Sequence, residues 1–112
     1  MAVGELPPGL QAALRDFRRR LAAIFGDAVA DVRLFGSHAR GDAHEESDVD
    51  VLVVLDRAGA KERRQALDIG TDVSLEHGIV LSPLVLDRQT FLRWRRQQRP
   101  IVVEVEREGM PV

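Results

Sequence analysis

Apolar residues recur at helical spacing near the start of the chain and at strand spacing after it. Residues 10–24 carry an apolar stripe at intervals of three and four residues, which predicts a helix opened by Pro7 and Pro8 and ended by Gly26. The stripe consists of Leu10, Leu14, Phe17, Leu21 and Ile24. Residues 28–35 and 49–55 predict two strands. Between them, residues 36–47 are polar and rich in glycine, which predicts a loop with room for one helical turn.

The second half of the chain predicts a helix, a strand and two further helices. Residues 60–76 form the first helix, which ends near Gly78. Its apolar positions are Ala66, Leu67, Ile69, Val73 and Leu75. Residues 79–86 predict a third strand, where Pro83 indicates an edge position or a bulge because proline cannot donate to the ladder. Residues 90–98 predict a short arginine-rich helix. A last helix runs from Pro100 to Gly109 with Ile101, Val102 and Val105 facing inward.

The order α-β-(loop)-β-α-β-α-α predicts an α+β fold. In this α/β arrangement, the helices pack on a short sheet of mixed parallel and antiparallel strands. A chain of 112 residues suits one domain over residues 1–112. The longest nearly apolar stretch, residues 49–55, is far shorter than the roughly 20 residues that a membrane span needs, so no membrane association is expected. The chain has no cysteine, which excludes disulfides and thiolate chemistry. A cytoplasmic location is expected.

Acidic and basic residues are nearly balanced in number but separated along the chain. Sixteen Lys and Arg against 18 Asp and Glu give a net charge of −2, so bulk charge does not predict nucleic-acid binding. Residues 42–50 contain five carboxylates and no Lys or Arg, while residues 88–99 contain five arginines and no acid. This separation suggests that one face of the protein binds cations and that another binds anions or an acidic partner. The alternative is that both segments are ordinary charged patches exposed to solvent.

Two aspartates at the start of the second strand are candidate metal ligands. Asp48 and Asp50 are two residues apart, so their side chains leave the same face of a strand, about 6.6 Å apart along the backbone. Like charges on one strand repel each other unless a cation lies between them, and Mg²⁺ prefers hard oxygen ligands. The alternative is a solvated strand entrance with two ordinary acids.

The turn after the first strand is a candidate phosphate-binding segment. Gly36 allows close approach of a ligand to the backbone, and Ser37 is predicted to cap a helical turn whose free N–H groups suit a phosphate. Arg40 can add a charge-assisted hydrogen bond to a phosphate, and Gly41 allows the chain to turn back. The alternative is a tight turn with a serine cap and a surface arginine.

Gly36-Ser37, a short spacer and Asp48-x-Asp50 together resemble the signature of nucleotidyltransferases of the DNA polymerase β superfamily. The stretch GSHARGDAHEESDVDVLVVL is similar to the minimal nucleotidyltransferases of prokaryotes. The resemblance implies that Gly36, Ser37 and Arg40 bind the phosphates of a nucleoside triphosphate. It implies that Asp48 and Asp50 are the catalytic residues and ligate Mg²⁺, with ATP as the substrate.

The resemblance also implies a third carboxylate from a later strand, and the predicted third strand contains no acid. Ser82 stands about where the aspartate is expected, and a neutral hydroxyl is a poor Mg²⁺ ligand and a poor base. The nearest acids along the chain are Asp72, Glu76 and Asp87, and none of them occupies the expected position.

Two functions therefore stay open. The resemblance implies Mg²⁺-dependent transfer of a nucleoside monophosphate, AMP from ATP, to a hydroxyl of a protein partner. In that case the domain is the antitoxin of a HEPN-type helical toxin. The alternative is a catalytically impaired nucleotide-binding or partner-binding module that neutralises a toxin by contact. A domain of this size is expected to complete its substrate pocket with a partner, in a hetero- or homo-oligomer.

Trp94 and the three histidines are further candidates for binding roles. Trp94 lies among arginines and is interpreted as a cap on the core, with base stacking or a partner anchor as the alternatives. RNA binding is not favoured. His38 is expected to be an exposed loop residue, with a nucleotide contact as the alternative. His44 and His77 lack metal-ligand spacing to each other.

Overall fold

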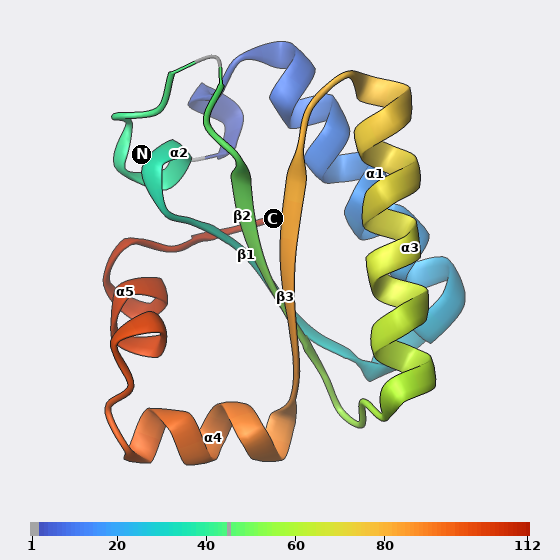
Figure 1. Cartoon of the computed structure of the whole chain (residues 1–112), viewed down its shortest axis with the longest axis vertical. Coiled ribbons are helices and arrows are strands. Elements are labelled where there is room, and N and C mark those ends of the chain that lie inside the picture. The colour runs from blue at the N-terminus through green and yellow to red at the C-terminus, as the bar shows by residue number, and fades with distance from the viewer. Residues whose placement is uncertain (1–2, 45) are drawn as a thin grey trace.

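A four-stranded mixed sheet lies between two pairs of helices in the computed structural model (Figure 1). The structure describes residues 3–44 and 46–112, so Glu45 of the acidic segment lies outside it. The strand order is β3-β2-β1-β4. The strands are β1 (Val29–Phe35), β2 (Val49–Leu55), β3 (Leu81–Asp87) and β4 (Met110–Pro111). β1 is antiparallel to β2 and β4, whereas β2 and β3 are parallel. The predicted α+β class is confirmed.

Helices α1 (Pro8–Phe25) and α3 (Ala60–His77) cover one face of the sheet, on the right in Figure 1. The apolar stripe predicted for α1 is buried except at its last position, since Ile24 is 58% exposed. Phe25 packs against the core in its place. The prediction for Ile24 was wrong because Phe25, which follows the buried Leu21 by four residues, takes the next position on the buried side of the helix.

The buried side of α3 is narrower than its apolar composition suggests. Ala66, Gly70 and Val73 lie on the side that faces the sheet, whereas two of the apolar residues of this helix, Leu67 and Leu75, are exposed. Successive helical residues are about 100° apart, so Leu67 and Leu75 point away from that side. A Cβ on Gly70 would lie 2.9 Å from Pro83 Cγ, so the glycine permits close packing of α3 on β3. β3 is an edge strand, as Pro83 predicted.

Helices α4 (Arg88–Arg96) and α5 (Pro100–Glu108) cover part of the opposite face. A second apolar cluster joins them to the sheet; it contains Phe35, Leu52, Val54, Leu84, Leu86, Phe91, Trp94, Ile101 and Val105. Trp94 therefore caps the core, as predicted. The Arg99 guanidinium lies 4.7 Å from the centroid of its ring.

Short elements complete the chain. Two 3₁₀ turns, η1 (Val3–Glu5) and η2 (Gly26–Ala28), flank α1, and the one-turn helix α2 (Ser37–Arg40) follows β1. Strand β4, which pairs with Arg33 and Leu34 of β1, was not predicted. Among the described residues, no helix is both long enough and apolar enough to cross a membrane.

Candidate active site

Asp48, Asp50 and Ser82 meet at one end of the sheet, on the face that carries α4 and α5. Side chains alternate along β2, so Asp50 shares its face with Leu52 and Val54 of the second apolar cluster. In the register of the sheet, Asp50 is opposite Phe35 on β1 and beside Ser82 on β3. Asp48 directly precedes β2 and is exposed, and Asp50 is partly buried. The helices cover the apolar part of this face, and the polar residues lie beyond it.

The turn between β1 and α2 lies directly against Asp50. Gly36 has φ 76° and ψ −153°, a conformation that is essentially restricted to glycine. Its carbonyl accepts hydrogen bonds from the backbone N–H groups of Ala39 and Arg40, at 3.1 Å each. A Cβ at this position would lie 3.2 Å from Asp50 Cγ and closer still to Oδ2. The glycine thus allows the Asp50 carboxylate to approach the backbone of the turn.

The predicted cap of the α2 turn was wrong. Gly36 occupies the N-cap position and makes no side-chain cap, and Ser37 is the first helical residue. Helix geometry leaves the first N–H groups of the turn without partners inside it. Gly41 ends the turn in the left-handed conformation, with φ 81°. The sequence therefore identified the turn correctly and misplaced the serine by one position.

Negative charge accumulates around Asp50. Burial raises the pKa of its carboxyl group above the ordinary value, and the neighbouring charges of Asp48 and Glu104 raise it further. The positive charges of His38 and Arg40 act in the opposite direction and do not cancel this effect. A carboxylate in such surroundings is stabilised by a cation, and its oxygens are ligands that suit a hard divalent metal.

Arg40 is paired with three carboxylates. Its Nη1 lies 2.9 Å from Glu104 Oε1 and 3.4 Å from Glu108 Oε2, and its Nε lies 3.2 Å from Asp42 Oδ2. These contacts link the end of α2 to α5, which was not foreseen from the sequence. The side chain of Arg40 is 38% exposed, so the ion pairs are open to solvent.

None of the three acids considered as substitutes for Ser82 lies beside Asp50 in the sheet. Asp87 pairs with Leu55 at the opposite end of β3, where its Oδ1 caps α4 through the N–H of Thr90. Asp72 is exposed on α3, and Glu76, also on α3, pairs with Arg20 of α1. Because α3 lies on the other face of the sheet, neither acid shares the face of Asp50.

Glu104 is the acid near Asp50 that the sequence analysis missed. It lies on α5, immediately before the buried Val105. A signal was available, because Glu104 follows the inward Ile101 by three residues and Glu108 follows Glu104 by four, which places the three side chains along one side of a helix. Which strand end that side faces depends on the path of the chain after β3.

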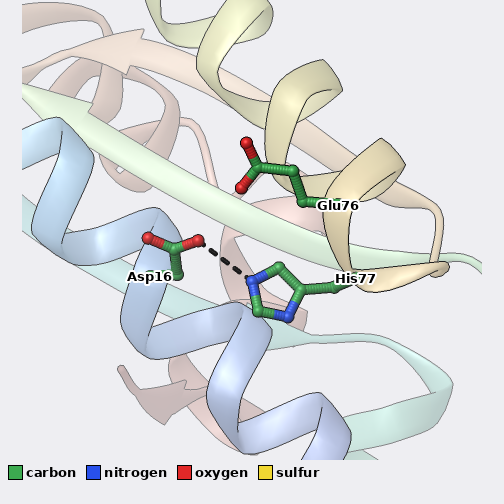
Figure 2. Close-up of side chains that lie close together, drawn as sticks. All are labelled: Asp16, Glu76 and His77. Carbon is green, nitrogen blue, oxygen red and sulfur yellow. Dashed lines mark hydrogen bonds and ion pairs between the residues drawn. The ribbon is translucent and has the colours of Figure 1, made fainter.

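A second cluster of possible metal ligands lies between α1 and α3. Asp16, Glu76 and His77 place one ligand atom each within 4.8 Å of one another, and His77 Nε2 lies 3.0 Å from Asp16 Oδ2 (Figure 2). Both acids are already paired, since Arg20 contacts Asp16 and Glu76 and Arg19 also contacts Asp16. The hydrogen bond with His77, followed by those with Arg20 and Arg19, holds the pKa of Asp16 well below its ordinary value. The cluster is better explained as an ion-pair network that joins the two helices.

His38 lines two hollows between the N-terminal segment and the segment that follows α2. The larger, of about 470 Å³, lies between Leu6 and Pro7 on one side and Gly41 and His44 on the other. The second, of about 350 Å³, extends toward His77. His38 was predicted to be exposed, but it is partly buried and its Nε2 lies 3.2 Å from the carbonyl oxygen of Ser47. That contact ties α2 to the segment before Asp48.

Comparison with known proteins identifies the family. Two proteins of Methanocaldococcus jannaschii, each named "Putative protein adenylyltransferase", are 33% identical to this chain. One alignment covers 88% of this chain and 94% of the relative, and the other covers 70% and 75%. A solved structure titled "Crystal structure of the toxin-antitoxin with AMP-PNP" shares the fold, with a TM-score of 0.53 and 16% identity over 85% of this chain and 68% of that chain. The family model "Nucleotidyltransferase domain" matches residues 14–106. The chain belongs to this nucleotidyltransferase family, within the DNA polymerase β superfamily.

Proposed function

We propose that this protein transfers AMP from ATP, in a Mg²⁺-dependent reaction, to a hydroxyl group of a protein partner. The observation that carries the proposal is the contact between the Gly36 turn and Asp50, because it joins the proposed phosphate-binding turn to the candidate carboxylate pair. Membership of the nucleotidyltransferase family and the names of the archaeal relatives support the same reaction. We treat residues 1–112 as one minimal domain and expect it to act in the cytoplasm.

The residues present fit a divalent cation. Nucleotidyltransferases generally use divalent metals. Asp48 and Asp50 offer hard oxygen ligands, and a cation would offset the burial and the neighbouring charge of Asp48 that raise the pKa of Asp50. When bound, Mg²⁺ would neutralise the triphosphate and polarise the α-phosphorus. The turn at Gly36 and Ser37, together with Arg40, would hold the phosphates through backbone N–H groups and a guanidinium.

The proposed transfer places specific demands on the site. The acceptor oxygen attacks the α-phosphorus, the bond to the bridging oxygen breaks, and pyrophosphate leaves while a base accepts the hydroxyl proton. The hollow beside His38 is lined by residues of α2 and of the N-terminal segment and by none of Gly36, Ser37, Asp48 and Asp50, so we do not assign it to the nucleoside or to the acceptor side chain. The role of this chain is then to align the triphosphate and the hydroxyl in a site that it completes with its partner.

The proposed partner is a HEPN-type helical toxin, with this protein as its antitoxin. Support comes from the solved structure that shares this fold, whose title describes a toxin-antitoxin with AMP-PNP. The Arg88–Arg99 segment, whose five arginines are exposed around α4, offers a cationic surface for an acidic partner. We expect a hetero-oligomer with the toxin.

A second candidate function rests on Ser82. The register places this neutral residue beside Asp50 on the adjacent strand, where a third acid would complete the metal site. A protein with a weakened site could still bind nucleotide and neutralise its partner by contact alone. The two functions differ in whether a covalent AMP appears on the partner.

A labelling experiment separates the two functions. The protein is mixed with Mg²⁺ and a candidate partner, a small helical protein if the neighbouring reading frame encodes one, using ATP labelled at either the α- or the γ-phosphorus. AMP transfer labels the partner from α-labelled ATP only, and Asp48→Asn with Asp50→Asn abolishes the label. Neutralisation of the partner without any label would support the binding module and refute the enzyme. Label from the γ-phosphorus would show phosphoryl transfer and refute the proposed reaction.

A further inference from the structure

We infer that His38 is a positioning residue for the candidate metal site. Its ring holds the peptide group between Ser47 and Asp48 and so sets where the Asp48 carboxylate lies relative to the phosphate turn. In this role His38 touches neither the metal nor the nucleotide. The inference rests on the proposed function, because it concerns the same metal site, and it adds a residue that lies outside the signature motif.

The two aspartates of the candidate site are held in different ways. Asp50 belongs to β2 and is paired on both sides, with Phe35 of β1 and with Ser82 of β3. Asp48 precedes the strand, is exposed, and takes part in none of the strand pairings among the described residues. The separation of the two carboxylates therefore depends on what holds the backbone at Asp48.

Both peptide groups that flank Asp48 are held by a hydrogen bond. After Asp48, the N–H of Val49 donates to the carbonyl oxygen of Val80 at 2.8 Å. Before Asp48, the carbonyl oxygen of Ser47 lies 3.2 Å from His38 Nε2, and because a carbonyl oxygen only accepts, Nε2 is the donor. Only φ and ψ of Asp48 separate the two peptide planes, so holding both planes restricts the direction of its side chain.

The hydrogen bond from His38 joins two ordered turns. His38 is partly buried and is the second residue of α2, the turn that begins at Ser37. Ser47 closes a turn with His44, since its N–H donates to the His44 carbonyl at 2.9 Å and its Oγ accepts from the His44 N–H at 3.0 Å. One turn is the proposed phosphate site and the other leads into Asp48. His38 therefore links the phosphate turn to a proposed metal ligand.

Loss of this link should affect the metal more than the phosphates. Mg²⁺ demands ligand oxygens in nearly ideal octahedral positions, so a carboxylate that is free to move binds it less well. The phosphate turn is held separately, because the N–H groups of Ala39 and Arg40 donate to the carbonyl oxygen of Gly36. The defect should therefore appear in the part of ATP binding that depends on Mg²⁺.

The test measures binding of a non-cleavable ATP analogue by titration calorimetry, with and without Mg²⁺, and the ratio of the two Kd values gives the gain from Mg²⁺. His38→Leu keeps an apolar side chain of similar size but has no donor, whereas His38→Gln places an N–H about as far from the backbone as Nε2. We expect His38→Leu to lower the gain by about 10-fold and His38→Gln to keep it within about 2-fold of wild type, as for other residues that orient metal ligands.

His44→Leu is the matched control, because His44 is exposed in the same loop and only its backbone contacts Ser47 among the described residues. It should keep the full gain from Mg²⁺. Binding of the analogue without Mg²⁺ should be the same in all four proteins. Melting curves of each variant show that the fold is intact.

Each other outcome overturns the inference in a distinct way. If His38→Leu keeps the gain while Asp50→Asn loses it, the metal site stands and the role of His38 is refuted. If His38→Leu and His38→Gln lose the gain equally, the donated hydrogen bond is not what matters. If His38→Leu also loses binding without Mg²⁺, His38 contacts the nucleotide directly. If wild type shows no gain from Mg²⁺, the proposed metal site fails and the inference fails with it.

Discussion

Replacing Gly36 with alanine tests whether the turn and Asp50 form one site. The backbone at Gly36, with φ 76° and ψ −153°, is a conformation that costs a non-glycine residue about 1–3 kcal/mol. The added Cβ would lie 3.2 Å from Asp50 Cγ and closer to Oδ2, so the carboxylate must move or the turn must open. At about 4–8 °C per kcal/mol for a domain of about 100 residues, Gly36→Ala should lower the melting temperature by at least about 4 °C.

The decisive readout is the stabilisation by Mg²⁺-ATP, measured as a shift in melting temperature. A ligand at 100 times its Kd stabilises the native state by about 2.7 kcal/mol, and Gly36→Ala should lose most of this gain because Asp50 is displaced. Gly78→Ala is the matched control: φ is +68° there, nothing lies within 4 Å of its Cβ, and the strain is about 1–2 kcal/mol. It should be destabilised yet keep the full shift. An undiminished shift in Gly36→Ala would refute the coupling of turn and carboxylate.

Three further predictions concern single carboxylates. Asp50→Asn should raise the melting temperature of the metal-free protein near neutral pH, because the raised pKa of Asp50 means that its charge opposes folding there; a lower melting temperature would contradict this. Asp87→Ala should lower the free energy of unfolding, measured with denaturant, by about 0.5–2 kcal/mol, because it removes the side-chain cap on the N–H of Thr90. The control Asp56→Ala removes an exposed ion pair with Arg88 and should lower it by at most about 1 kcal/mol. Asp16 has a lowered pKa in the folded state, so its stabilising contribution is present above the unfolded pKa of about 3.9 and is lost as the pH falls below that value. The melting temperature of Asp16→Asn should therefore decrease less than that of wild type between pH 5 and pH 2.

Local patterns in the sequence predicted most of the elements. The helices at residues 8–25 and 60–77, the strand at 49–55 and the edge position of Pro83 all follow from spacing and residue type. Strand β4 has only two residues, too few to form a pattern, and its pairing depends on where α5 ends. Leu67 and Leu75 show that the apolar residues of α3, unlike the stripe of α1, do not by themselves indicate which side of the helix meets the sheet.

The candidate site was predictable only where it lies in one stretch of sequence. Gly36, Ser37, Asp48 and Asp50 are close along the chain, and their spacing suggested the chemistry that the family comparison supports. Glu104 is 54 residues beyond Asp50 in the numbering, and it approaches the site because α5 packs back on the sheet through Val105. No local pattern reports such a return, so the absence of an acid near Ser82 left the third carboxylate unassigned.

The Mg²⁺ dependence of ATP binding tests the central claim most directly. Titration calorimetry compares wild type with the variant that combines Asp48→Asn and Asp50→Asn, each with and without Mg²⁺. If the two aspartates hold the metal beside the phosphate turn, wild type binds ATP at least about 10-fold more tightly with Mg²⁺ than without it, and the variant binds ATP weakly under both conditions. Equal gains from Mg²⁺ in the two proteins would contradict the account.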